Sequence, residues 1–248
     1  MFSFFKKKQP TIEFSCKEWA IRKYAPIQPA SKFLPQEYRD LPAGKACPFD
    51  TFNEATILTL KMCPAVTNWL NAGYVIPAWA DMEFIFTDTS FEFKTSNLDY
   101  QTKIHPEVQF LNMMDRFNFR QDVKIDSPWH IKTAPGYSMM WLPLWFHNSN
   151  YQAVPAVVDG DIVPNHNPIN LMFHERKSTK IKMGDPLVQI IPFKRENITA
   201  VTREYSWQDQ KRMQSIMGLN QLSKFGWRNY IKKKVNYKLD AKDTEIDD

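Results

Sequence analysis

Six short apolar segments follow one another at fairly even spacing between Trp129 and Pro192. They comprise residues 129–131, 137–142, 156–159, 169–173, 179–181 and 187–192. Short strands at even spacing are typical of a β-sandwich or a barrel. The 18 Phe and 8 Trp favour strands, and the 17 Pro divide the chain into segments too short for long helices. We therefore predict a mainly β protein.

Two further stretches predict local structure upstream of these segments. Residues 82–86 and 91–94 alternate apolar with polar residues around a polar turn, which predicts a β-hairpin. Residues 56–61 and 74–77 are expected to be extended, with a short helix at 64–70 between them. The pattern at 104–120 is ambiguous, and we expect a loop there with room for a helix at 107–114.

Composition divides the chain into three parts. Residues 1–48 mix prolines with charges, which predicts an irregular arm with at most a short strand at 12–16. Residues 49–205 hold the strand pattern and an insertion at about 95–128. Residues 206–248 form a tail in which Ser206 and Asp209 make a capping box, so we expect a helix that ends near Gly218. The tail is acidic from residue 240 onward, where we expect it to fray.

Cysteine usage and hydropathy favour a reduced, cytosolic chain. The three cysteines are scattered and form no Cys-x-x-Cys pair, which argues against a disulfide scaffold. No apolar run is long enough to cross a bilayer, and the N-terminus places its apolar residues before its lysines, the reverse of a secretory signal. The five histidines lack the helical spacing that is typical of zinc sites. We expect neither a membrane span nor a metal.

The tail combines positive charge with aromatic residues. Residues 211–238 contain eight Lys or Arg and no acid. The candidate contact residues are Lys224, Trp227, Arg228, Tyr230, Lys232, Lys233 and Lys234. Such a segment binds single-stranded nucleic acid when its cations meet phosphates and its aromatic rings stack on bases. Alternatively, a helical arm buries its apolar face on a neighbouring subunit and leaves the lysines in solvent. The net charge of only +5 favours the second interpretation.

Three motifs lie in order within the strand-rich region. They are PGY at residues 135–137, PAVVDGD at 155–161 and GDPLVQII at 184–191. In this order they resemble the core of the trimeric dUTPase and dCTP deaminase group. The resemblance implies a β-clip or distorted barrel of short strands, flanked here by the N-terminal arm and the helical tail.

The same resemblance implies roles for four residues. Asp159 occupies the place of the aspartate that orients or deprotonates the attacking water in those enzymes. Tyr137, Asp161 and Gln189 would then contribute to nucleotide binding. Asp159 has a second interpretation as a hairpin aspartate that hydrogen-bonds its own turn, and Gln189 as an amide that satisfies backbone groups.

Several groups that a dUTPase needs for a triphosphate are replaced in this chain. Ile162 stands where a tyrosine closes over the deoxyribose, and residues 142–146 lack the arginine and serine that contact the phosphates. Those groups would supply charge-assisted and hydroxyl hydrogen bonds. The glycine-rich C-terminal segment is also replaced, since only Gly218 and Gly226 follow Gly184. The resemblance therefore implies the fold more strongly than the reaction.

A second resemblance covers most of residues 30–197. The stretches WHIKTAPGY at 129–137 and GDPLVQIIPFKRE at 184–196 are similar to phrases that recur in a family of uncharacterised proteins encoded mainly by tailed bacteriophages. The upstream KMCP at 61–64 and AGYVIP at 72–77 also resemble that family. This resemblance implies a viral protein located in the host cytoplasm or in the virion.

Together these patterns lead to one favoured function and two alternatives. We expect a non-catalytic binding or structural assembly protein without a cofactor, a homo-oligomer and possible trimer that joins other phage structural proteins. The first alternative is a divergent deoxynucleoside triphosphate hydrolase, with Asp159 activating water and Mg²⁺ holding the phosphates. The second is a nucleic-acid-binding protein that works through the tail.

Overall fold

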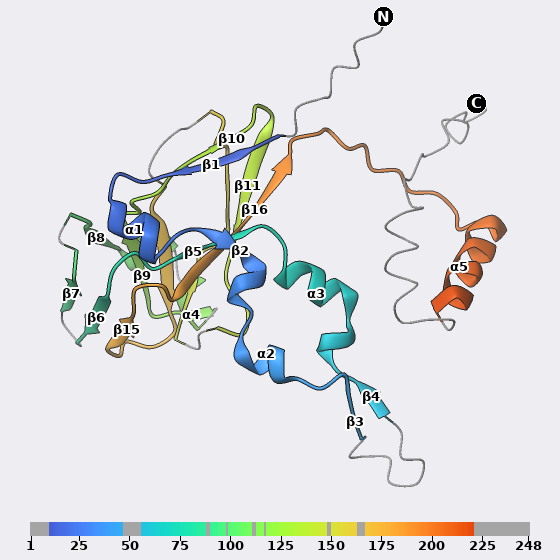
Figure 1. Cartoon of the computed structure of the whole chain (residues 1–248), viewed down its shortest axis with the longest axis horizontal. Helices are drawn as coiled ribbons and strands as arrows, with labels where there is room; N and C mark the ends of the chain where they lie inside the picture. The colour runs from blue at the N-terminus through green and yellow to red at the C-terminus, as the bar shows by residue number, and fades with distance from the viewer. Residues whose placement is uncertain are drawn as a thin grey trace, which may run out of the picture. The chain divides into compact units, whose positions relative to one another are not determined.

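Short antiparallel strands make up most of the chain. The computed structural model describes residues 10–46, 56–87, 90–97, 99–110, 113–116, 118–147, 150–162 and 167–220. Within them lie sixteen strands and five α-helices, and all the strand pairs are antiparallel (Figure 1). The predicted mainly β class is confirmed. The chain divides into two compact units, Met1–Glu196 and Asn197–Asp248.

A five-stranded sheet carries the three sequence motifs. Its strands, in spatial order, are β13 (Ala156–Val158), β11 (Tyr137–Leu142), β16 (Pro186–Lys194), β5 (Tyr74–Pro77) and β2 (Gln28–Pro29). On β11 the side chains of Met139 and Trp141 are buried, whereas Met140 between them is exposed. Successive side chains of a strand point to opposite faces of the sheet. The sheet therefore has an apolar inner face on the core and an outer face that includes Met140.

Two further sheets complete the core. β12 (Tyr151–Ala153), β14 (Ile169–Phe173), β9 (Gln121–Ile125) and β8 (Thr102–His105) form a four-stranded sheet in that order, and β15 (Thr179–Ile181), β6 (Met82–Phe86) and β7 (Phe91–Thr95) form a three-stranded sheet. The Phe84 ring on β6 lies 5.1 Å from the Phe173 ring on β14. Both sheets therefore share one hydrophobic core. The predicted hairpin is confirmed as β6 and β7, as are the strands predicted at 169–173 and 179–181.

The described strands form open sheets and do not close into the predicted distorted barrel. The five-stranded sheet ends at β13 and β2, and the four- and three-stranded sheets also have two edge strands each. A barrel closes only when its edge strands pair with each other. β2 has two residues and β13 has three, so neither presents a ladder long enough for that pairing. The finding corrects the barrel to open antiparallel sheets packed on a common core.

The described part of the N-terminal arm is more regular than its prolines and charges predict. β1 (Ile12–Ser15) pairs with β10 (His130–Thr133), so that Ile12 lies opposite Thr133 and Ser15 lies opposite His130. Three short helices follow, α1 (Trp19–Tyr24), the 3₁₀ helix η1 (Ala30–Phe33) and α2 (Gln36–Asp40). α1 buries Ile21 in the core. A six-residue helix with one buried side chain is too short to show helical periodicity in a sequence.

The insertion at about 95–128 supplies two strands of the core. β8 and β9 both lie in it, and the chain between them forms the 3₁₀ helix η3 (Glu107–Phe110) and α4 (Met113–Arg116). Four of the five residues of β9 are buried, including the polar Gln121 and Asp122. Buried polar residues break the alternation that marks a half-buried strand, which explains why the sequence predicts no strand at 121–125.

A strand pair and two short helices precede β5. β3 (Gly44–Ala46) pairs with β4 (Thr56–Leu58), and the 3₁₀ helix η2 (Leu60–Met62) and α3 (Pro64–Leu70) follow. The predicted helix is confirmed as α3, with Pro64 in its first turn.

A glycine turn aligns β5 with β16 in the core. Gly73 has a φ of +67°, and a Cβ at this position would lie 2.1 Å from the carbonyl oxygen of Ile190. Only glycine fits this close approach between β5 and β16.

The second unit, considered by itself, contains the helix α5 (Trp207–Asn220). The Asp209 carboxylate accepts the Ser206 backbone N–H at 2.9 Å, and the Ser206 hydroxyl oxygen accepts the Asp209 backbone N–H at 3.3 Å. These reciprocal bonds confirm the predicted capping box. The helix continues two residues beyond the predicted end at Gly218. Of the helices that the structure describes, none has the length and apolarity needed to cross a membrane.

Candidate functional site

The hairpin aspartates lie in a tight turn that follows β13. The Ile162 backbone N–H donates to the Asp159 carbonyl oxygen at 3.1 Å, which closes the turn. A Cβ on Gly160 would lie 2.9 Å from the Met139 Cε and 3.2 Å from the Thr133 Oγ1. The glycine therefore lets the turn approach β11 and β10 closely, and this fixes Asp159 and Asp161 at one end of the five-stranded sheet.

Arg195 binds Asp161 with both arms of its guanidinium group. Its Nη1 donates to Oδ1 at 2.8 Å and its Nη2 donates to Oδ2 at 2.5 Å. The Gly136 backbone N–H adds a third bond to Oδ2 at 2.7 Å. The side chain of Asp161 is only 10% exposed. The Arg195 hydrogen bonds, helped by the Gly136 N–H, lower the pKa of Asp161 from 3.8 to about 2. This carboxylate is a fully ionised acceptor at neutral pH.

The same arginine also binds Asp159, the candidate catalytic base. Arg195 Nη1 lies 3.1 Å from Asp159 Oδ1, and the Ser138 hydroxyl donates to that oxygen at 2.5 Å. Arg195 Nη1 also donates to Ser138 Oγ at 3.0 Å, which closes a ring of contacts among the three side chains. The Asp159 side chain remains 44% exposed. Asp159 is thus held by a cation and a hydroxyl on one oxygen.

These contacts join three separate chain segments into one polar network. Arg195 directly follows β16, and its backbone N–H donates to the Gly136 carbonyl oxygen at 2.8 Å. Ser138 lies on β11, and the aspartates lie in the turn after β13. The network therefore fastens the hairpin to the two central strands. We name Arg195, Asp161, Asp159 and Ser138 the hairpin network.

Arg195 and Ser138 are not among the residues that the sequence predicts for this site. Arg195 is visible there only as part of the phrase that resembles the phage family, beyond the end of a predicted strand. The antiparallel register places Lys194 opposite Tyr137, and so carries the next residue to the PGY turn. A sequence without strand pairing offers no signal for that proximity.

Tyr137 lines a hollow beside the hairpin network. The hollow has a volume of about 330 Å³ and is lined by Pro10, Thr11, Ile12, Tyr74, Thr133, Tyr137 and Pro192. Tyr74 is held by an edge-to-face contact with Phe14, with ring centroids 5.1 Å apart. The Tyr137 carbonyl oxygen accepts the Thr133 hydroxyl at 2.7 Å and Arg195 Nη1 at 3.4 Å. Tyr137 thus joins the network through its backbone and also lines the hollow.

Gln189 lies away from the other predicted site residues. It pairs with Leu142 at the far end of β11, five residues from Tyr137, or about 17 Å along the strand. Its side chain is buried, and its Nε2 donates to the carbonyl oxygens of Trp69 at 2.9 Å and Ala72 at 2.7 Å. These bonds satisfy the carbonyls at the end of α3. The geometry therefore gives Gln189 the interpretation of a buried amide that satisfies the backbone.

The remaining candidates fall into two groups. Among the described residues no group of three or more His, Cys, Asp or Glu is placed to hold a metal ion. The Mg²⁺ of the hydrolase alternative would need oxygens from Asp159 and Asp161, and in both residues Arg195 already binds a carboxylate oxygen. The tail candidates Lys224, Trp227, Arg228, Tyr230, Lys232, Lys233 and Lys234 lie outside the described residues, as does His166.

Comparison with known proteins adds no assignment to this geometry. No protein-family model matches the chain, and no curated protein is significantly similar to it.

Proposed function

We propose that this chain is a phage-encoded, non-catalytic binding or structural assembly protein built on a dUTPase-like arrangement of strands. It works without a cofactor, as a homo-oligomer that closes into a trimer, in the host cytoplasm or as part of the virion. The hairpin network is the observation that carries the proposal, because it assigns a structural role to the two carboxylates that the enzymes of that group would use.

The hairpin network supports a structural role through its contacts. A general base needs a carboxylate oxygen within hydrogen-bond reach of the attacking water, and Asp159 Oδ1 already contacts Arg195 and accepts the Ser138 hydroxyl. Arg195 contacts both aspartates. The bidentate geometry on Asp161 is the strong form of this interaction. An arginine in this position holds the turn in place and binds both carboxylate oxygens of Asp161 and one of Asp159.

The placement of the three motifs supports the dUTPase-like part of the proposal. The motif strands β13, β11 and β16 are neighbours in one antiparallel sheet, in the spatial order β13-β11-β16. The hairpin turn, the PGY turn and the end of the last motif strand therefore meet at one end of the five-stranded sheet. Motifs that meet in space share a structural role more readily than motifs that are only ordered in sequence.

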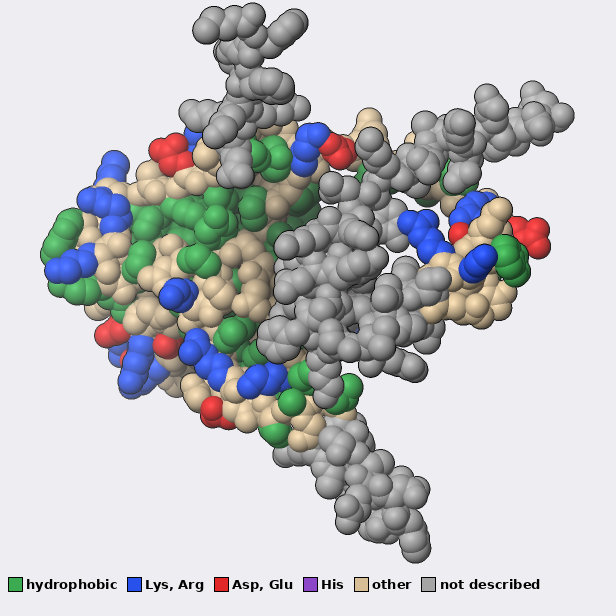
Figure 2. All heavy atoms as spheres, turned by 45° about the vertical axis from the view of Figure 1, so that its right-hand side comes forward, with side chains coloured by type: hydrophobic (Ala, Val, Ile, Leu, Met, Phe, Trp, Pro, Cys, Tyr) green, Lys and Arg blue, Asp and Glu red, His purple; other side chains and the backbone are tan. Residues whose placement is uncertain are grey.

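Exposed apolar side chains on the outer face of the five-stranded sheet support the assembly part. Met140 is 40% exposed, and Val157, which lies directly opposite it on β13, is 61% exposed. Exposed apolar side chains that lie next to each other mark contact surfaces in folded proteins. Figure 2 shows separately that hydrophobic side chains gather over part of the visible face of the first unit, Met1–Glu196. A second copy of the chain is the occupant that we assign to the outer face of the five-stranded sheet, in line with the proposed trimer.

A nucleotide hydrolysis assay tests the non-catalytic part. Purified protein is incubated with each of the deoxynucleoside triphosphates and Mg²⁺, in parallel with Asp159→Asn and with Asp185→Asn, an exposed aspartate in the turn before β16. We expect no turnover above the buffer blank in any sample. Turnover that Asp159→Asn abolishes and Asp185→Asn retains would instead establish the hydrolase alternative.

Mass spectrometry of purified virions tests the assembly part. Peptides of this chain at a copy number similar to that of known particle proteins are the expected result. Their absence from particles, together with a monomeric mass in solution, would contradict an assembly role.

A further inference from the structure

A second hollow lies on the outer face of the three-stranded sheet, away from the hairpin network. It has a volume of about 310 Å³. Met82, Phe84 and Phe86 of β6 are buried, so Glu83 and Ile85 between them point to the outer face. The register places Lys180 of β15 and Lys94 of β7 directly opposite Glu83, one on each side. Directly opposite residues share a face, so this row carries two ammonium groups and one carboxylate.

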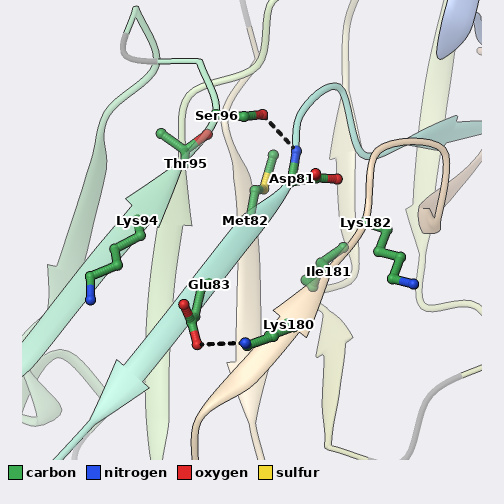
Figure 3. Close-up of a pocket in the computed structure, with 9 residues that line it drawn as sticks. All are labelled: Asp81, Met82, Glu83, Lys94, Thr95, Ser96, Lys180, Ile181 and Lys182. Carbon is green, nitrogen blue, oxygen red and sulfur yellow. Dashed lines mark hydrogen bonds and ion pairs between the residues drawn. The ribbon is translucent and has the colours of Figure 1, made fainter.

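A second row at the end of the strands adds another cation. Lys182 follows β15, Asp81 precedes β6 and Ser96 follows β7, and all three line the hollow (Figure 3). Asp81 Oδ1 accepts the Met183 backbone N–H at 2.8 Å. The Ser96 Oγ accepts the Asp81 backbone N–H at 3.0 Å and so keeps its own proton for donation.

The hydrogen-bonding groups left for a ligand are mainly donors. Glu83 Oε1 contacts Lys180 at 3.4 Å and the Ser178 hydroxyl at 3.4 Å. Figure 3 shows Lys180 directed at Glu83, whereas Lys94 and Lys182 extend to either side. Lys94 has an exposed ion pair with Glu92 at 3.5 Å, a contact that is weak in solvent. Three ammonium groups and one hydroxyl therefore line the hollow together with the carboxylates of Asp81 and Glu83, whereas the side chains of Met82 and Ile181 are buried on the core face.

We propose that this hollow binds a phosphate group. Lys94, Lys180 and Lys182 would bind the phosphate oxygens, with the Ser96 hydroxyl as a fourth donor. Lysine binds phosphate as a mobile point charge, which suits ammonium groups that reach the hollow from separate strands. The volume is at the lower end of the range for small-molecule sites, so the ligand is small. This site is independent of the assembly role proposed above.

The test follows backbone amide signals of the isotope-labelled protein during titration with phenyl phosphate at constant ionic strength. We expect saturable shifts at Ser96 and Lys182 and none at Lys103 and Lys124, a lysine pair directly opposite each other on the four-stranded sheet. Inorganic phosphate should compete with phenyl phosphate, because the proposed donors contact only the phosphate group. Shifts that rise linearly without saturation, or that are as large at Lys103 and Lys124, would overturn the proposal.

Two double variants with the same change of charge complete the test. Lys94→Gln with Lys182→Gln should weaken phenyl phosphate binding at least ten-fold, and Lys103→Gln with Lys124→Gln should leave it unchanged. Equal weakening by both would mean that general positive charge attracts the anion, which contradicts a site in the hollow. Lys94, Lys103 and Lys182 are exposed and Lys124 is half-buried, and a circular dichroism spectrum equal to that of the parent verifies that each variant is folded.

Discussion

Asp122 lies on β9 with neither carboxylate oxygen hydrogen-bonded among the described residues. Its side chain is fully buried, opposite His105 on one neighbouring strand and Met172 on the other. Burial raises the pKa of Asp122 from 3.8 to about 6, and the nearby charge of His105 lowers it by a smaller amount. A buried charge of this kind is a cost to the folded state at neutral pH.

Replacing Asp122 with asparagine should therefore stabilise the protein at neutral pH. Because the folded-state pKa is raised, the wild type loses stability as pH rises from about 4 to about 6, and the asparagine variant does not. The two pKa values correspond to up to about 3 kcal/mol at pH 7. Urea unfolding of both proteins at pH 4 and pH 7 measures the difference. Asp126→Asn, which changes an exposed carboxylate four residues along, is the control. A variant that is less stable than the wild type at pH 7 would contradict this account.

Replacing Arg195 with glutamine should lower the melting temperature by a few degrees at pH 7. The lowered pKa of Asp161 means that the network contributes stability above pH 4 and loses it as pH falls from about 4 to about 2. The difference between variant and wild type should shrink over that range. Lys194→Gln removes a neighbouring ion pair with Glu196 that is exposed, and it should change the melting temperature little. Equal losses in both variants would show that the network has no special role. Thermal unfolding followed by circular dichroism provides the measurement.

At the level of elements, two glycines with positive φ allow the cost of backbone strain to be distinguished from the cost of a steric clash when each is replaced with alanine. Gly73 has a φ of +67° and lies against the Ile190 backbone, whereas Gly136 has a φ of +80° and a Cβ added there would meet nothing within 4 Å. Alanine at either position must adopt the left-handed region, which costs about 1 to 2 kcal/mol. Only alanine at position 73 must also displace β16.

We therefore expect Gly73→Ala to destabilise the core unit more than Gly136→Ala. Gly136→Ala should cost about 1 kcal/mol, and Gly73→Ala should cost more than about 3 kcal/mol because the clash involves backbone that cannot rotate away. Free energies of unfolding from urea titrations of the two variants test the order. A larger loss for Gly136→Ala would mean that the turn after β10 is the tighter of the two.

The sequence predicted the individual helices and strands better than it predicted which strands pair with each other. β5, β6, β11, β14, β15 and α3 appear where alternation, β-branched residues or a proline indicated them. α1 and β9 escaped prediction for a physical reason: α1 is too short to show a period, and β9 buries Gln121 and Asp122 where alternation expects apolar residues. At the candidate site, Asp159, Asp161 and Tyr137 were named and do meet. Arg195 and Ser138 join them only through strand pairing, which no local pattern encodes.

At the scale of the whole molecule, the exposed outer face of the five-stranded sheet should govern the oligomeric state. Lysine in place of Val157 puts charge within the proposed contact and should convert the proposed trimer to a monomer. Val201→Lys, at another exposed valine in the second unit, should leave the proposed trimer intact. Light scattering coupled to gel filtration gives the molar mass of each variant. A wild-type protein that is monomeric at all concentrations would contradict the self-association.

The pairing of β1 with β10 also determines when β1 can fold during synthesis, because β1 cannot pair until β10 has been made. Ser15 and His130 are 115 residues apart in the chain, so β1 leaves the ribosome long before its partner strand exists. At about 5 to 20 residues per second, the wait is on the order of ten seconds. β16, between β11 and β5 in the five-stranded sheet, is synthesised later still. The apolar residues of the first strands must remain soluble over that interval, so the yield of folded protein should depend on translation speed and on chaperones that hold the nascent chain.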